Sequence, residues 1–160
     1  MASIPEEERG RLRALLETQR WGALATARDN EPLASWVAFV RDEAGHEFLM
    51  HISRLARHTR FLELNPSASL GISESDANPE GNPQLLARVS LNGTVKIVER
   101  DAPDYARART SYLARFPAAA QTFELGDFAL YRLTVNDARY VGGFGRAYRV
   151  GAGDLQALRT

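Results

Sequence analysis

The hydrophobic pattern of the first third of the chain predicts one helix and three strands. Apolar residues at helical spacing follow a cluster of acidic residues, which predicts a helix over residues 5–19. Short apolar runs bounded by polar or turn-forming residues predict strands over residues 21–27, 32–40 and 46–52. The first two strands are separated by the polar sequence RDNE, which indicates a β-hairpin.

The middle of the chain combines a short helix with strands. A helix is predicted within residues 51–66, a strand over 67–74, and a loop rich in turn formers over 74–84. From residue 85 to 98 apolar and polar residues alternate, which predicts a long strand with one face toward solvent. The apolar face comprises Leu85, Ala87, Val89, Leu91, Gly93, Val95 and Ile97, and the polar face comprises Arg88, Ser90, Asn92, Thr94 and Lys96.

The last third predicts another helix and a return to extended structure. We expect a helix over residues 101–116, with Asp101 as its cap and an apolar side formed by Tyr105, Ala108, Tyr112 and Leu113. Residues 126–143 are extended in pattern, interrupted by the turn-like sequence NDA. The tail, 151–160, is expected to form a short helix or a frayed end.

The order of these elements indicates the fold class. About six strands with isolated helices, without regular βαβ alternation, predict a mainly β fold with helical decoration, built on an antiparallel barrel. A length of 160 residues suits one domain with its own core, so we expect a single domain over residues 1–160.

Composition narrows the function classes. Lys+Arg and Asp+Glu are 20 each, so the formal charge is zero, which argues against nucleic acid or a polybasic membrane surface as a partner. There is no cysteine, which excludes disulfides, thiolate metal sites and a cysteine nucleophile. No segment approaches about 20 apolar residues, and the N-terminal sequence lacks the apolar core of a signal peptide. We therefore expect a cytoplasmic protein with no membrane partner.

Residues 51–66, HISRLARHTRFLELNP, place cations in the opening turns of the predicted helix. Cations are disfavoured there, because a helix N-terminus carries a partial positive charge of about half an elementary unit. Ser53 fits an N-cap, so its hydroxyl and the free backbone N–H groups would form an anion site near Arg57 and His58. A phosphate site is one interpretation. The other is a solvated basic face paired with acids such as Glu63.

Residues 140–150, YVGGFGRAYRV, form the second informative stretch. Its glycines permit close backbone approach to a flat ligand or a partner chain, with Phe144 able to stack and Arg146 able to supply charge. Too little chain follows for the βαβ unit that a dinucleotide fingerprint needs. The alternative interpretation is a tight turn at the rim of a barrel.

The three histidines, His46, His51 and His58, do not suggest a hydrolase or a metal site. None has an evident Ser and Asp arrangement around it. His51 falls at a strand end and His58 within a helix, so we predict no metal site.

Three stretches together resemble the FMN-binding split-barrel family related to pyridoxamine 5′-phosphate oxidase. They are LATARDNEPLASWVAF (24–39), LMHISRLARHTRFLELNPSASLGI (49–72) and GDFALYRLTVNDARYVGGFGRAYRV (126–150). The last two are most similar to the haem-utilisation (HugZ-like) branch, and the resemblance covers residues 10–150. It implies a six-stranded antiparallel split β-barrel (α+β) that forms a homodimer, with FMN in the cleft between the subunits.

The resemblance also implies where the cofactor would lie. The positions implied are Ser35, Trp36 and Val37 along the flavin; His51, Ile52 and Ser53 near the ribityl chain and phosphate; Arg57 and His58 at the phosphate; and Phe144 and Arg146 over the ring. In this interpretation the phosphate accounts for the cations at the helix start.

The resemblance implies an FMN-dependent oxidoreductase acting with a small-molecule substrate or electron acceptor. The oxidase carries an Arg-Lys pair where this chain has Ala56 and Arg57, and its C-terminal product-recognition segment is not recognisable, so vitamin B6 oxidation is not expected. Two alternatives remain. One is a haem-binding or haem-degrading protein with His51 or His58 as an iron ligand, and the other is a non-catalytic flavin-binding module.

Overall fold

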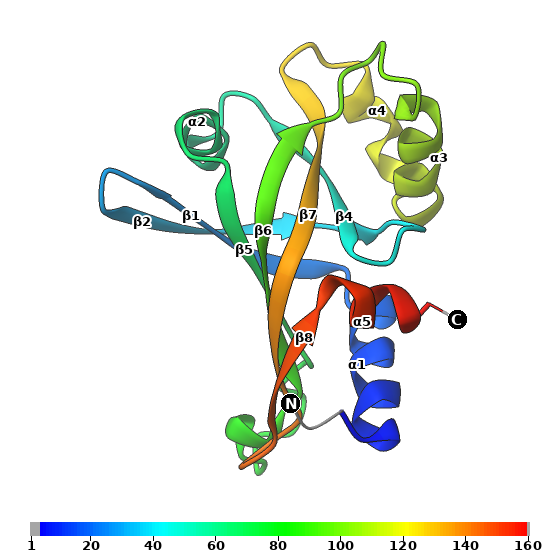
Figure 1. Ribbon diagram of the computed structural model, residues 1–160. Helices are drawn as coiled ribbons and strands as arrows, with labels where there is room; N and C mark the ends of the chain where they lie inside the picture. The colour runs from blue at the N-terminus through cyan, green and yellow to red at the C-terminus, as the bar shows by residue number, and fades with distance from the viewer. Residues whose placement is uncertain (1–3, 160) are drawn as a thin grey trace.

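The computed structural model describes residues 4–159 and places eight strands in one antiparallel sheet. The strands are β1 (Trp21–Arg28), β2 (Glu31–Ala38), β3 (Val40–Arg41), β4 (Glu47–Ser53), β5 (Ser67–Ser73), β6 (Arg88–Ile97), β7 (Phe128–Val141) and β8 (Ala147–Gly151). Their order is β2-β1-β5-β6-β7-β4-β3, and β8 pairs with β7. The curled sheet forms the half-barrel of Figure 1, which confirms the split-barrel prediction. The count exceeds six because β3 and β8 are short additions to the sheet.

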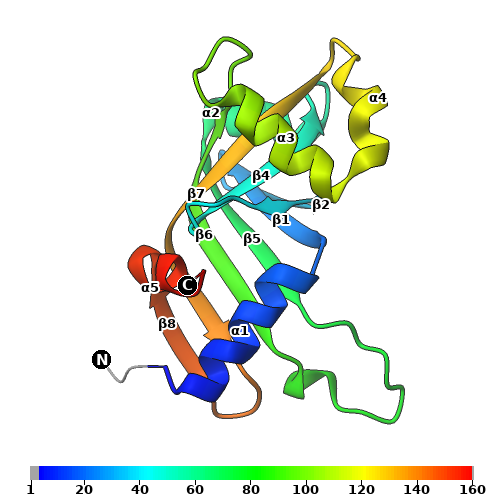
Figure 2. The same cartoon turned by 90° about the vertical axis from the view of Figure 1, so that its right-hand side faces the viewer.

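Helices lie at both ends of the sheet. They are α1 (Glu6–Thr18), α2 (Arg57–Leu64), α3 (Tyr105–Arg115), α4 (Ala120–Phe123) and α5 (Ala152–Ala157), with 3₁₀ turns η1 (Pro83–Leu85) and η2 (Pro117–Ala119). Figure 2 shows α1 and α5 near β8, and α3 and α4 at the other end. Within residues 4–159, no helix combines the length and the apolar character needed to cross a membrane. Residues 1–3 and 160 of the predicted domain lie outside the described part of the chain.

The core has two parts, separated by strand β4. Leu12 and Leu16 of α1 are fully buried against the inner faces of the strands, as the helical spacing predicts. The second cluster lies beneath α3 and α4, where Tyr112 and Phe123 pack with Leu130. Strand β4 contributes to both clusters and is therefore buried on both faces, which explains its continuous apolar sequence.

The hairpin between β1 and β2 forms as predicted. Asp29 and Asn30 both have positive φ, 47° and 65°. Two consecutive left-handed residues make the turn whose twist matches that of the flanking strands, and Asp and Asn tolerate this conformation better than most residues.

The predicted interruption at NDA is wrong, because β7 runs through it. The register shifts there: Asn92 pairs with Asp137 and Gly93 with Val135, so Asn136 is an extra residue in β7. At this bulge β7 changes its second partner from β4 to β8. Turn-forming residues mark the bulge because it bends and twists the strand.

The predicted cap of the third helix is also wrong. Helix α3 begins at Tyr105, after Asp104 rather than Asp101. Pro103 disfavours the helical conformation for the residue before it, so no helix can continue from Asp101. The Asp104 carboxylate binds Arg132 of β7 at 2.6 Å and makes no cap hydrogen bond. The predicted apolar side is confirmed, with Ala108 and Tyr112 buried.

Candidate functional site

A cavity of about 550 Å³ lies on the outward face of the sheet. Its lining comes from the end of α1, from β1, β2, β5, β6 and β7, and from the start of the loop after β5. This volume is typical of a site for a small molecule or cofactor.

One row of directly paired residues crosses six neighbouring strands at this cavity. In strand order its members are Trp36, Ala23, Gly71, Ser90, Arg139 and Arg149. Residues paired across antiparallel strands project from the same face, and this face is the one opposite the buried core. The row has an aromatic residue at one end, small residues in the middle and cationic residues at the other end. We call this row, with the cavity above it, the trough.

The aromatic end is a stacked pair of tryptophans. The rings of Trp21 and Trp36 lie 6.1 Å apart with an interplanar angle of 9°. Both side chains line the cavity and are largely exposed, at 55% and 63%. They are the only tryptophans in the chain. Such an exposed apolar pair is suited to cover a flat ligand or a partner surface.

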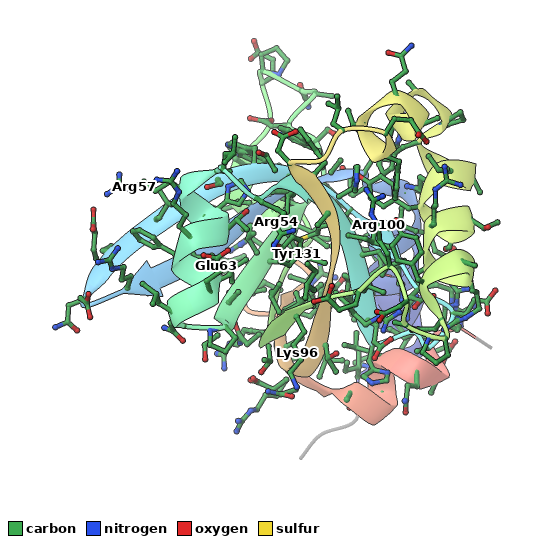
Figure 3. The ribbon with its side chains drawn as sticks, turned by 90° about the horizontal axis from the view of Figure 1, so that it is seen from above. Arg54, Arg57, Glu63, Lys96, Arg100 and Tyr131 are labelled. Atoms are coloured by element: carbon green, nitrogen blue, oxygen red, sulfur yellow. The ribbon has the colours of Figure 1, made fainter. Side chains whose placement is uncertain are left out.

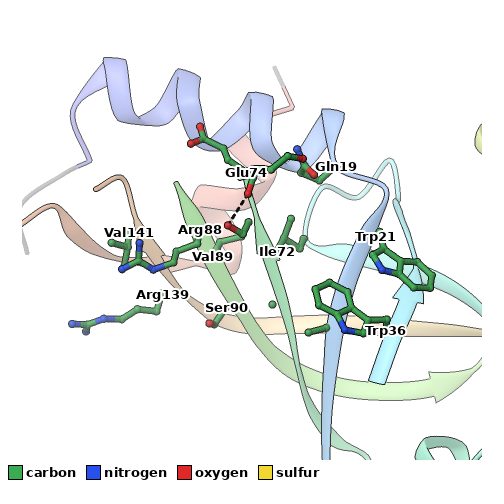
Figure 4. Close-up of a pocket in the computed structure, with 14 residues that line it drawn as sticks. Gln19, Trp21, Trp36, Ile72, Glu74, Arg88, Val89, Ser90, Arg139 and Val141 are labelled. Carbon is green, nitrogen blue, oxygen red and sulfur yellow. Dashed lines mark hydrogen bonds between the residues drawn. The ribbon is translucent and has the colours of Figure 1, made fainter. Parts of the chain in front are cut away.

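The opposite end is basic. Figure 4 shows Arg88 and Arg139 at the end of the cavity away from the tryptophans. Nη1 of Arg88 donates to the carbonyls of Gln84 and Leu86, both at 3.1 Å. The side chain of Arg139 makes no hydrogen bond or ion pair with any residue from 4 to 159. This end of the cavity therefore favours an anionic group.

Glu74 also lines the cavity, but its charge is already paired. Its carboxylate accepts hydrogen bonds from Arg11 of α1 at 2.8 and 3.1 Å and from the backbone N–H of Ala87 at 2.8 Å. The hydrogen bond from Arg11 is the main reason that the pKa of Glu74 is lowered. Glu74 therefore does not neutralise the arginines across the cavity.

Helix α1 holds the loop between β7 and β8 through a buried carboxylate. Glu8 is 3% exposed, accepts a hydrogen bond from the hydroxyl of Tyr140 at 2.7 Å and pairs with Arg146 at 2.9 Å. Burial, followed by the hydrogen bond to Glu8, raises the pKa of Tyr140. Arg146 is thus neutralised within the chain, while Phe144 at the loop tip is 84% exposed. The predicted glycine-rich turn is present, but neither Phe144 nor Arg146 lines the cavity.

The structure corrects the predicted N-cap at Ser53. Helix α2 begins at Arg57 with Ala56 in the cap position, and the Ser53 hydroxyl instead accepts the N–H of Leu55 at 3.2 Å. Arg57 forms an ion pair with Glu31 at the tip of the β1–β2 hairpin. Figure 3 shows Arg57 at the outer end of α2, apart from Arg54, Arg100 and Tyr131. An acid from another element therefore neutralises this cation.

His58 follows Arg57 but faces the protein. It is half-buried, and its Nε2 is buried without a hydrogen-bond partner among the described residues. Burial lowers the pKa of His58, so the imidazole is held neutral and adds no positive charge to the helix start.

The remaining predicted residues lie on β2 and β4. Trp36 lines the cavity, whereas its neighbours Ser35 and Val37 point to the other face of β2, and Val37 belongs to the core. Ile52 is likewise a core residue. His51 stacks on Phe123 at 3.7 Å beneath α4. Of the ten predicted positions, the cavity includes only Trp36.

A second hollow of about 460 Å³ lies between α3 and the start of β7. Its lining includes Arg54 and Arg100, but also Glu99 and Asp101. With both signs of charge present, it has no evident preference for an anion or a cation. Residues 4–159 contain no group of three or more His, Asp or Glu that could hold a metal ion.

Sequence reasoning missed most of the cavity. Its members include Trp21, Ala23, Gly71, Ser90 and Arg139, which come from four separate strands. The alternation of residues 85–98 placed Arg88 and Ser90 on a solvent face, but nothing local indicates which strands lie beside them.

Comparisons with known proteins identify the family. The family model described as pyridoxamine 5′-phosphate oxidase matches residues 9–142. The heme oxygenase HutZ of Vibrio cholerae is 34% identical, with 78% of this chain and 69% of that protein covered. The chloroplastic heme oxygenase HOZ of Arabidopsis thaliana is also 34% identical, over 94% of this chain and 44% of that protein.

A solved structure agrees with these relatives. The heme-binding protein of Mycobacterium smegmatis matches 98% of this chain and 62% of its own, with a TM-score of 0.82 and 29% identity. This chain thus spans less than half of the plant relative and under two thirds of the mycobacterial structure.

These findings overturn FMN as the expected cofactor. The relatives are named for haem, not for a flavin. The structure offers a physical reason: Arg57, the expected phosphate partner, is neutralised by Glu31, and Arg146, expected over the ring, by Glu8. Helix α2 and the β7–β8 loop also lie at opposite ends of the molecule, at the top and the bottom of Figure 1.

Members of this family commonly dimerise. The chain belongs to the pyridoxamine 5′-phosphate oxidase family, and within that family to the haem-utilisation branch.

Proposed function

We propose that this chain binds haem in the trough that crosses β1, β5, β6 and β7, as a haem-binding or haem-degrading protein. The observation that supports the proposal is the cross-strand row from Trp36 to Arg149. Haem is a flat and mostly apolar molecule with two carboxylates on one edge. Along the row, the trough offers an aromatic end, a floor of small residues and a cationic end, in that order.

The dimensions of the trough suit a tetrapyrrole. From Trp36 on β2 to Arg139 on β7 the row crosses four strand intervals, or about 19 Å at about 4.8 Å each. The floor between them consists of Ala23, Gly71 and Ser90, whose side chains are too small to obstruct a ring. The tryptophans would cover the apolar edge of the ring and exclude water from it.

The lining does not supply an iron ligand of the usual kinds. It contains no His, Cys, Met or Tyr. His51 is enclosed by aromatic rings and His58 lies on α2, so neither reaches the trough in this chain. The residues present therefore fit the macrocycle and its carboxylates. Bound haem would supply the redox chemistry of its iron, while this chain supplies position, orientation and partial exclusion of water.

The open side of the trough is where we place a second subunit. The exposed tryptophan pair lies on this side, and dimers are common in the family. A two-fold partner would cover the pair and bury the remaining face of the ligand.

A fluorescence titration tests the proposal directly. Because both tryptophans line the trough, haemin bound there should quench nearly all of the tryptophan emission. The quenching should saturate at one haemin per chain. Gly71→Leu should abolish saturable quenching by filling the floor. A Cβ at Gly71 meets only ordinary contacts, 3.6 Å or more away, so the fold should tolerate the change.

Ser69→Leu is the matched control. Ser69 lies on the same strand and face, one row away, and does not line the cavity. The Ser69→Leu variant should bind haemin with the affinity of the wild type. Equal binding by wild type and Gly71→Leu would contradict the proposed site. Loss of the haem absorbance on adding a reductant in air would distinguish degradation from storage.

A further inference from the structure

Two arginines face each other at the basic end of the trough. Arg139 of β7 pairs directly with Arg149 of β8, which places their Cβ atoms about 5 Å apart on the same face. Both side chains are exposed, and neither makes a hydrogen bond or an ion pair with another residue between 4 and 159. Asp137, two residues along β7, does not pair with either of them. Like charges in this position repel and destabilise a sheet unless an anion lies between them.

A third arginine lies beside this pair. Arg88 of β6 is paired with Val141 of β7, two residues from Arg139, so it is the diagonal neighbour of Arg139. Its Nη1 is held by the backbone of the loop before β6, and its Nε and Nη2 have no hydrogen-bond partner among the described residues. The nearby carboxylate of Glu74 is occupied by Arg11. Three guanidinium groups thus lie at the same end of the trough, and no acid from the described part of the chain neutralises them.

Resting on the proposed function, we propose that Arg139 and Arg149, together with Arg88, bind the two carboxylates of the tetrapyrrole and determine which tetrapyrroles the chain accepts. A guanidinium binds a carboxylate through two parallel hydrogen bonds, so a row of arginines matches a pair of carboxylates on one edge of a ring. The row also sets orientation, because the carboxylate edge lies over β7 and β8 and the apolar edge against the tryptophans on β1 and β2.

Selectivity follows from this arrangement. Esterification of the carboxylates removes their charges but leaves the ring unchanged. The chain should therefore bind haemin more tightly than haemin dimethyl ester, and added salt should weaken the binding of haemin more than that of the ester.

The experiment compares these two probes in the same detergent-containing buffer. Tryptophan quenching is measured for the wild type, for Arg139→Gln/Arg149→Gln, and for Arg60→Gln as a control on an exposed arginine of α2. The double variant should bind haemin about a hundredfold more weakly, about tenfold for each charged contact, and bind the ester like the wild type. Arg60→Gln should change neither the affinity for haemin nor the affinity for the ester.

The outcomes separate this inference from the proposed function. Equal affinity of the double variant and the wild type for haemin would overturn the carboxylate contacts while leaving the haem site in place. Equal loss for haemin and ester, with a changed sedimentation coefficient, would assign the arginines to a protein contact and also overturn the inference. If neither probe binds to the wild type, the proposed function itself fails.

Discussion

Replacing Gly142 by alanine should disturb the buried carboxylate that holds the β7–β8 loop to α1. Gly142 follows the end of β7 and is buried beside Glu8. A Cβ at this position would overlap Oε2 of Glu8 and lie 2.6 Å from its Cδ. The backbone of Gly142 is not in the left-handed region, so the carboxylate is the obstacle. Glu8 must move, and it then loses its hydrogen bond from Tyr140 and its ion pair with Arg146.

The size of the effect follows from these two contacts. The hydrogen bond from the fully buried Tyr140 hydroxyl to a charged carboxylate contributes about 1.5–3 kcal/mol. The Arg146 side chain is about half exposed, so its ion pair contributes at most about 1 kcal/mol. Gly142→Ala should therefore lower the free energy of unfolding by about 2–4 kcal/mol. Glu8→Ala should cost about as much, because it removes the same two contacts.

A double-mutant cycle checks the reasoning by urea denaturation. In Glu8→Ala/Gly142→Ala the new methyl group meets no carboxylate, so the double variant should be about as stable as Glu8→Ala alone, with a coupling energy of about 2 kcal/mol or more. Gly10→Ala is the matched control. It adds a methyl group to an exposed position of α1 with nothing within 4 Å, and should stabilise the protein by up to about 1 kcal/mol. If the effects of the Glu8 and Gly142 changes add, the proposed collision does not exist.

Two further predictions concern stability. Burial, followed by the nearby Arg100 and Arg109, lowers the pKa of His51 to about 4, so between pH 6.5 and 4 the unfolded chain binds a proton that the folded chain does not. His51 should therefore lower the free energy of unfolding by about 2 kcal/mol from pH 7 to pH 5, and this contribution should vanish in His51→Gln. A slope unchanged by the substitution would refute the assignment. Gly93→Ala should lower the free energy of unfolding by more than about 2 kcal/mol, because its Cβ would overlap the Thr134 carbonyl at the bulge. Urea or thermal unfolding measures this loss. Near-wild-type stability would contradict the prediction and show that the two backbones can separate there.

The sequence by itself determined most of the helices and strands, and the family. The acidic start and leucine spacing of α1, the DN turn between β1 and β2, and the alternation from Arg88 to Ile97 in β6 are local signals that the structure confirms. The predicted strand began too early, because Leu85, assigned to its apolar face, lies in η1 and is 51% exposed. Local signals succeed because periodicity and turn chemistry act over a few residues. Local signals also misplaced two helix caps, because they do not include the turns that precede a helix. Ser53 has a suitable side chain, but the turn after β4 delays α2 to Arg57. Asp101 is suitable too, but Pro103 delays α3 to Tyr105.

Tertiary structure alone decided where charges are paired. Arg57 looked like a free cation at a helix start, yet Glu31 from a distant hairpin neutralises it. Arg146 looked available for a ligand, yet it pairs with Glu8 of α1. Arg139 and Arg149 were not among the residues predicted from the sequence, yet they lie at the trough with Arg88, and no acid between residues 4 and 159 neutralises the three cations. Ion pairs between elements depend on packing that local patterns do not contain.

The position of the site was also a tertiary outcome. Its row joins Trp36, Ala23, Gly71, Ser90 and Arg139 from strands that are not in chain order in the sheet. Alternation along a strand tells which residues share a face, but it does not tell which strand lies beside another or in what register. A shift of one residue in any strand would turn its member of the row into the core. Strand order and register, set by the packing of the whole barrel, therefore created the trough from residues that are individually ordinary.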